Sequence, residues 1–261
     1  MTTAPAIFPA SWSPQKRSAV TIIIACLAAL LFLWLMAIPL GFLPSPIGPA
    51  AQQFAEGARV TVALTMVAGP AGIVLGMLAA LAKLSRLPPL RWISALYIWV
   101  IRGTPLLVQV LFMFYALPVI APALQLSDFN SAVIALAFNV GAYNAEVIRA
   151  GIQAVHKGQT EAARSLGLSP LQTFRDVIFP QSFRVALPSL ANNFVSLLKD
   201  SSLAYVIGVV ELSNIGNRIQ SASFEPIPVF ITTASIYLIL TTAMTQIASA
   251  LERQLDVESH P

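Results

Sequence analysis

The chain has 261 residues and a formal net charge of +4; apolar residues make up 57% of it and charged residues only 10%. Because a soluble domain carries about a quarter charged residues, this composition excludes an ordinary soluble fold and predicts an all-α, polytopic membrane protein. The small positive charge does not indicate a nucleic-acid partner. The single cysteine, Cys26, lies in an apolar run, so the sequence has no disulfide framework and no cysteine-based metal site.

Six apolar stretches are predicted to cross the bilayer, since about 20 apolar residues suffice for a helical span. The first is too long and too uniformly apolar for a cleaved signal peptide, and the Pro- and Gly-rich segment 41–49 then makes an outer loop. The predicted spans are approximately 18–40, 57–82, 92–117, 131–149, 187–210 and 229–251.

The second predicted span contains two glycine signals. Gly69 and Pro70 are expected to kink or loosen the helix. Gly72 and Gly76 form a Gly-x-x-x-Gly pair, which offers a smooth face for close helix approach. We expect this face to pack within the chain.

The distribution of lysine and arginine predicts the orientation. With the N-terminus in the cytoplasm, the outer segments hold only Arg59 and Arg218. Since cytoplasmic loops are enriched in Lys and Arg, both termini and the polar segment 153–185 are predicted to be cytoplasmic. The cations of the inner segments are Lys16, Arg17, Lys83, Arg86, Arg91, Arg149, Lys157, Arg164, Arg175, Arg184 and Arg253.

Within this polar segment, residues 158–180 are predicted to form a small helical hairpin. Thr160 is a predicted N-cap, and Gly167 is predicted to end the first helix. Ser169 then opens a second short helix, with Pro170 at its first position and Gln172 completing a capping box. From local physics alone, the hairpin is either a solvated connector or a docking element for a soluble partner.

Charged residues inside the predicted spans are informative because a charge at bilayer depth is costly unless it is paired or faces water. Arg102 either snorkels to the interface or lines a cavity. Gly103 and Pro105 beside it predict local unwinding, which membranes tolerate only where the backbone lines protein or a cavity.

Two further intramembrane charges leave alternatives open. Glu146 either pairs with Arg149 one turn away or contacts a substrate. Lys199 either pairs with Asp200 inside the fifth span or lies along a transport pathway. The polar residues nearby either hold helices together or line a path; they are Asn139, Tyr143, Asn192 and Asn193.

The sequence contains none of the residue patterns that carry catalysis or nucleotide binding. It has no paired acid–base carboxylates, no Ser/His/Asp arrangement, no H-E-x-x-H and no phosphate-binding loop. The chain is therefore predicted not to be an enzyme and to hold no metal or cofactor of its own.

Several motifs carry a resemblance to a known family. Glu161-Ala-Ala-x-x-x-Gly167, followed by Val177-Ile-Phe-Pro180, resembles the EAA loop of bacterial ABC importer permeases, with Val177 and Phe179 in place of the usual Ile and Leu. The stretches 102–109, 142–149, 157–163 and 197–203 are similar to the polar amino acid permease subfamily. The resemblance covers roughly residues 57–255.

The resemblance implies a five-helix type I ABC importer core over residues 57–255, with a coupling helix in the EAA loop 153–185. Residues 18–56 would add a transmembrane helix and a periplasmic loop, and 1–17 and 256–261 would be cytoplasmic tails. The chain would lie in the bacterial inner membrane as the permease subunit of an importer.

The implied partners are two copies of an ATPase subunit, which would carry ATP and Mg, and a second permease, identical or homologous. A periplasmic or surface solute-binding protein would deliver a polar amino acid. The alternatives are an importer for an amino-acid-derived solute such as an opine, and a stand-alone channel, which would not need a capped cytoplasmic hairpin.

The resemblance also predicts which residues couple to the ATPase, and the intramembrane polar residues predict the substrate pathway. We expect ATPase coupling from Gly158, Glu161, Ala162, Ala163, Leu166, Gly167, Leu168, Leu171 and Pro180. In the substrate pathway, Arg102 would hold an α-carboxylate and Glu146 or Asn139 would receive an α-amino group. The full predicted pathway set is Arg102, Thr104, Gln109, Asn139, Tyr143, Glu146, Lys199, Ser201 and Ser202.

Overall fold

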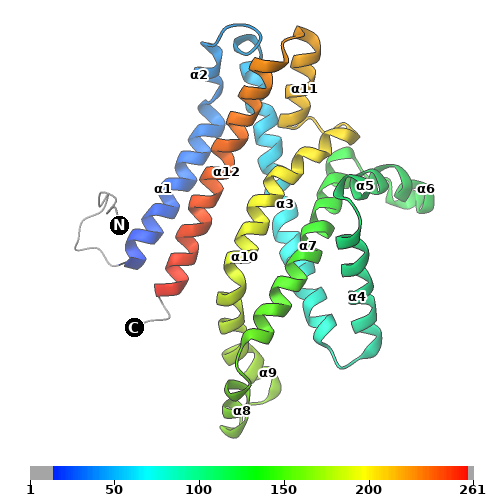
Figure 1. Ribbon diagram of the computed structural model, residues 1–261, viewed down its shortest axis with the longest axis vertical. Coiled ribbons are helices and arrows are strands. Elements are labelled where there is room, and N and C mark those ends of the chain that lie inside the picture. The colour runs from blue at the N-terminus through cyan, green and yellow to red at the C-terminus, as the bar shows by residue number, and fades with distance from the viewer. Residues whose placement is uncertain (1–13, 258–261) are drawn as a thin grey trace.

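The computed structural model describes residues 14–257, and every regular element in that part of the chain is a helix (Figure 1). The all-α prediction is confirmed. Most of each predicted tail, including His260, lies outside the described residues.

Four helical segments of the described part are long and apolar enough to cross a membrane. They lie in α1 (Pro14–Leu35) with α2 (Ala37–Gly41), α3 (Ala51–Leu84), α7 (Asp128–Ala154) and α12 (Pro226–Val257). A bent pair, Pro88–Gly103 and Leu106–Ile120, makes a fifth if it is one span. The predicted count of six is therefore not confirmed. The predicted fifth span overlaps α10 (Phe179–Asp200) and the segment that follows it, and α10 is not one of these four.

The third predicted span is divided between two helices. The chain forms α4 (Pro88–Gly103), breaks, and turns by 111°. Thr104 is extended, with φ −119° and ψ 147°, because the ring of Pro105 disfavours the helical conformation in the residue before it. The predicted local unwinding is thus confirmed. The chain then continues as α5 (Leu106–Leu111), the π-helical η2 (Phe112–Ala116), α6 (Leu117–Ile120) and η3 (Pro122–Leu124).

The centre of the fold is the close pairing of α3 with α7. A Cβ placed on Gly76 would lie 2.6 Å from the Cβ of Asn144, and one on Gly72 would collide with Val140. The Gly-x-x-x-Gly prediction is confirmed as packing within the chain. α3 runs through Pro70 as one helix, and the missing side chain of Gly69 leaves room for the ring of Phe194 on α10.

We expect the Gly76→Ala variant to lower the thermal stability of the purified protein. The new methyl group would meet the Cβ of Asn144 and, at 3.0 Å, the carbonyl oxygen of Gly141, and such overpacking costs about 1–3 kcal/mol. Gly41→Ala is the matched control, since a Cβ there meets nothing within 4 Å. An unchanged melting temperature in detergent for Gly76→Ala would contradict this packing.

The two ends of the helix bundle carry different elements. Figure 1 places α8 (Lys157–Ser165) and α9 (Pro170–Gln172) at one end, with the described ends of α1 and α12 and the α3–α4 turn toward that end. α2 and α11 (Leu212–Ser223) lie at the other end. α10 (Phe179–Asp200) reaches α11 through the 3-10 segment η5 (Ser201–Ile207).

Glu211 fastens α11 to the bundle, a role that the sequence reasoning missed. The carboxylate is fully buried and accepts hydrogen bonds of 2.8 Å from the backbone N–H groups of Ser213 and Asn214. It also accepts from the hydroxyls of Tyr237 on α12, at 2.9 Å, and Thr61 on α3, at 3.3 Å. One N-cap side chain thus joins three helices.

Candidate solute cavity and coupling hairpin

A polar cavity of about 390 Å³ lies where the α4–α5 break meets α7 and α10. Its volume is within the range of small-molecule sites. The break supplies one wall, since Thr104, Pro105 and Leu106 lie where the chain turns by 111°. The lining residues are Thr104, Pro105, Leu106, Asn139, Val140, Tyr143, Asn193, Ser196, Asp200 and Leu203.

Gln109 stabilises the broken backbone beside this cavity. Its amide nitrogen donates to the carbonyl oxygens of Ile101, at 2.7 Å, and Thr104, at 3.1 Å, and to the Thr104 hydroxyl at 3.0 Å. Its amide oxygen accepts from the side chain of Asn139 on α7 at 3.0 Å. Carbonyl groups freed by the break are therefore satisfied internally, as non-helical backbone at bilayer depth requires. In the described structure Gln109 supports the wall and does not line the cavity.

Charges of opposite sign flank the cavity. The guanidinium of Arg102 lies 5.2 Å from the ring centroid of Tyr143, which itself lines the cavity. Asp200, at the end of α10, contributes a half-buried carboxylate to the wall. The cavity wall also carries amide and hydroxyl groups of Asn139, Asn193 and Ser196. This arrangement suits a small solute that carries both a carboxylate and an amine.

The predicted pathway residues do not all meet at this cavity. Lys199 and Ser202 line a separate open groove of about 540 Å³, together with hydroxyl side chains of α12 such as Tyr237. Ser201 is buried and donates to the carbonyl oxygen of Leu198. The predicted Lys199–Asp200 ion pair is absent from the described residues, because consecutive helical positions point in different directions.

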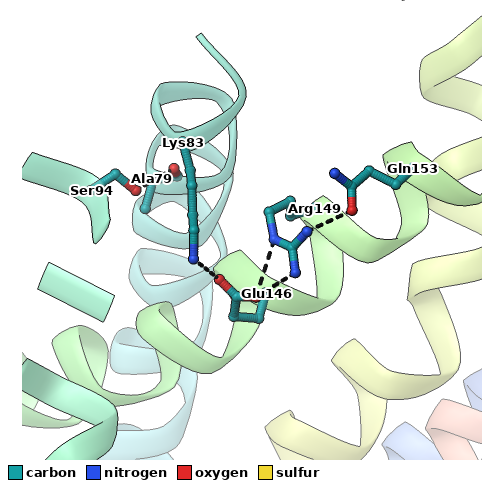
Figure 2. Close-up of polar contacts among 6 residues, drawn as sticks. All are labelled: Ala79, Lys83, Ser94, Glu146, Arg149 and Gln153. Carbon is teal, nitrogen blue, oxygen red and sulfur yellow. Dashed lines mark hydrogen bonds and ion pairs between the residues drawn. The ribbon is translucent and has the colours of Figure 1, made fainter. Parts of the chain in front are cut away.

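Glu146 belongs to a charged cluster between α3 and α7, which Figure 2 shows. Lys83 lies 2.6 Å from one carboxylate oxygen, and Arg149 lies 2.7 Å from the other. Arg149 also donates to Gln153 at 2.6 Å. The predicted i,i+3 pair is confirmed, and both Glu146 oxygens are engaged away from the cavity. Nearby, Ser94 on α4 donates to the Ala79 carbonyl at 2.7 Å.

We expect Glu146→Gln to lower thermal stability while leaving the KM for transport unchanged. The substitution leaves two cations facing each other across the α3–α7 contact. In a double-mutant cycle with Lys83→Met, we expect a coupling of about 0.5–3 kcal/mol between the two positions. A raised KM with unchanged stability would instead indicate that Glu146 contacts the solute.

The first half of the hairpin is a firmly capped helix. α8 (Lys157–Ser165) begins earlier than predicted: the N-cap is His156, whose Nδ1 accepts from the N–H of Gly158 at 3.1 Å, so the Thr160 prediction was wrong. Gly167 ends the helix as predicted, with φ +83°. The N–H of Leu168 bonds the Ala163 carbonyl at 3.2 Å, which completes a Schellman turn.

The second half of the hairpin is continuous with α10. The predicted capping box is confirmed: Ser169 Oγ accepts from Gln172 N–H, and Gln172 Oε1 accepts from Ser169 N–H. The prediction that the second helix is separate from the fifth span was wrong, since α9 passes through the π-helical η4 (Thr173–Ile178) into α10. Pro180 lacks an N–H to donate to the preceding turn, and a π turn accommodates this loss.

The tip of the hairpin presents apolar side chains outward. Leu166 is 81% exposed and Leu171 is 75% exposed, whereas Ala163 is buried where α8 packs on η4. Glu161 and Ala162 are exposed on α8. On the other arm Arg175 hydrogen-bonds Asp176 and holds the pKa of that carboxyl below its usual value. Two exposed leucines on a rigid polar projection indicate a contact surface.

The comparisons with known proteins agree with this geometry. The family described as "Binding-protein-dependent transport system inner membrane component" matches residues 72–257. The chain belongs to this family. It is thus a multi-pass inner-membrane component of a transport system.

Two relatives and one solved structure illustrate the likeness. The L-cystine transport system permease protein TcyB of Bacillus subtilis is 43% identical over 77% of this chain and 85% of its own length. The glutamine transport system permease protein GlnP of Escherichia coli is 38% identical over 82% of this chain and 97% of its own. The crystal structure of an amino acid ABC transporter with histidines matches with a TM-score of 0.72 and 40% identity, covering 78% of this chain and 95% of that one.

Proposed function

We propose that this chain is the permease subunit of an ATP-driven importer for a polar amino acid, in the bacterial inner membrane. The cavity flanked by Arg102 and Asp200 carries the proposal. Similar permeases are named for glutamine and cystine, whose side chains differ but whose α-amino and α-carboxylate groups are the same. A carboxylate in the cavity wall and a cation beside the wall residue Tyr143 match those shared groups.

In the proposed assembly, two copies of an ATPase subunit bind ATP and Mg and dock on the hairpin of two permeases. Leu166 and Leu171 bury into an apolar groove of the ATPase, while Glu161 pairs with a cation there. Firm caps at Gly167 and Ser169 make the hairpin stiff enough to transmit movement between two packed arrangements. The second permease is a copy of this chain or a homologue.

The proposed orientation places the hairpin and both chain termini in the cytoplasm. The basic α3–α4 turn lies toward the same end of the bundle as the hairpin (Figure 1), in agreement with the positive-inside rule. α11 then faces the periplasm, where a solute-binding protein delivers the amino acid. Residues 57–255 form the importer core, and residues 18–56 add one helix, which packs on α12.

Ligand screening of the cognate binding protein, followed by transport, tests the function. We expect one or a few polar amino acids to raise the melting temperature of the binding protein. The same amino acids should then accumulate, with ATP hydrolysis, in proteoliposomes that contain the whole complex. If only an opine stabilises the binding protein, the substrate is an amino-acid-derived solute and not a polar amino acid. Uptake without the ATPase would indicate a channel.

A further inference from the structure

The exposed face of α10 is polar between Ser189 and Lys199, whereas nearer to the hairpin it is apolar, with Val185 57% exposed. Ser189, Asn192, Ser196 and Lys199 are all exposed and are spaced by three, four and three residues, so they form one stripe along the helix. We call these four residues the α10 stripe. At 1.5 Å per residue it extends about 15 Å, roughly half the thickness of the bilayer core.

The opposite face of α10 is the packed one. Leu187, Leu190 and Leu197 are buried against the rest of the bundle. α10 is therefore amphipathic in the sense of a helix at a water interface, with apolar groups inside and polar groups outside. A helix that faces lipid has apolar side chains on its outer surface, because hydroxyl and amide groups lose their hydrogen bonds in hydrocarbon.

Other helices of the same bundle show what a lipid-compatible surface looks like here. On α3, Val74 is 59% exposed and Leu78 is 60% exposed. On α1, Leu27 is 54% exposed and Leu31 is 58% exposed. These surfaces are aliphatic, so the polar surface of α10 is a local feature and not a property of the whole bundle.

The stripe is continuous with the polar cavity. Ser196 belongs to both, and Asp200 lies one residue beyond Lys199 at the same end of α10. From Ser196 the stripe runs toward Ser189, which lies nearer to the hairpin end of the helix. A solute leaving the cavity in that direction would exchange hydrogen bonds with successive hydroxyl and amide groups.

We infer that the α10 stripe is a water-filled track along which the solute passes from the cavity toward the hairpin end. This inference rests on the proposed transport function. A zwitterionic solute suits the track because each donor and acceptor on it replaces a water molecule of the hydration shell. The residues that carry the track are Ser189, Asn192 and Ser196. Of these, the sequence reasoning named only Asn192, as a residue that either holds helices together or lines a path.

Cysteine accessibility in the assembled complex tests the track. Cys26 is first replaced by alanine, and Ser189→Cys, Asn192→Cys and Ser196→Cys are then made one at a time. A charged, membrane-impermeant methanethiosulfonate is applied to inside-out vesicles. Because this reagent requires a thiolate and thiolates form only in contact with water, we expect labelling at least about tenfold faster than at lipid-facing positions.

Val74→Cys and Leu27→Cys are the matched controls, since both side chains are more than half exposed and point away from the bundle. Stripe positions that label no faster than these controls overturn the inference. Disulfides that form between two copies at the stripe without labelling also overturn it, because they would indicate a dry permease–permease contact. Labelling does not depend on which solute is carried, so a failed transport assay with rapid labelling would reject the proposed substrate and keep the track.

Asn192→Leu adds a functional readout. We expect it to lower the maximal transport rate about tenfold with little change in KM, since the solute would lose the hydrogen bonds of one site along the track. Asn192→Ser, which keeps a polar group, should retain most of the rate. Equal rates for the two variants would contradict a role in passage.

Discussion

The Leu166→Asp/Leu171→Asp double variant is expected to abolish the association of the permease with its ATPase. Burial of one leucine contributes about 1.5–3 kcal/mol, so loss of both would weaken the contact by roughly 10²- to 10⁴-fold. The new carboxylates would also have to be desolvated in the groove. Co-purification of the ATPase should be lost, and ATP-dependent uptake should fall to about a hundredth of the wild-type rate.

The fold of the permease should not change, since both leucines project into solvent in the described structure. Thermal unfolding of the isolated permease checks this point. Gln159→Asp is the control, because Gln159 is exposed on the same helix and the substitution adds a carboxylate without removing an apolar contact. If the double variant keeps its ATPase, the hairpin is only a solvated connector.

The second large effect is expected at the cavity. Arg102→Ala and Asp200→Asn should each raise the KM for uptake, because each removes one partner of a charge-assisted hydrogen bond to the solute. Such a bond is worth about 1.5–3 kcal/mol, which corresponds to an increase of roughly 10- to 150-fold. Initial uptake rates in proteoliposomes, measured with saturated binding protein, report the change.

Arg59→Ala is a matched control for Arg102→Ala. The Arg59 guanidinium lies 5.1 Å from the Trp34 ring centroid, nearly the distance between Arg102 and the Tyr143 ring, but neither Arg59 nor Trp34 lines the cavity. Loss of a cation–π contact alone would therefore affect both variants alike. Full transport by Arg102→Ala would exclude the proposed carboxylate contact.

Local sequence signals were sufficient to predict the backbone conformation wherever neighbouring residues determine it. Gly167 is in the left-handed region, and Ser169 with Gln172 forms the predicted capping box. Gly103 and Pro105 correctly predicted an unwound segment, because proline acts on the residue immediately before it. The direction of the chain after the break was not predictable, since it depends on how α5 packs against α7.

Pairing between distant residues was harder to predict. Lys83 and Glu146 are far apart in the sequence, and only the α3–α7 packing brings them within 2.6 Å. Asp200 was considered as the ionic partner of Lys199, yet it lines the cavity while Lys199 lines the groove beside α12. The rotation of α10 about its axis separates the two, and that rotation is set by its packed leucines.

The sequence by itself determined that this is an all-helical membrane permease of the binding-protein-dependent family, with a capped polar hairpin. Composition, loop charges and short motifs are local quantities, so no knowledge of packing was needed. The tertiary structure decided which polar residues meet: the cavity at the α4–α5 break, the cluster around Glu146 and the α10 stripe. These depend on helix rotation and close approach, which arise from the burial of apolar faces across the whole bundle.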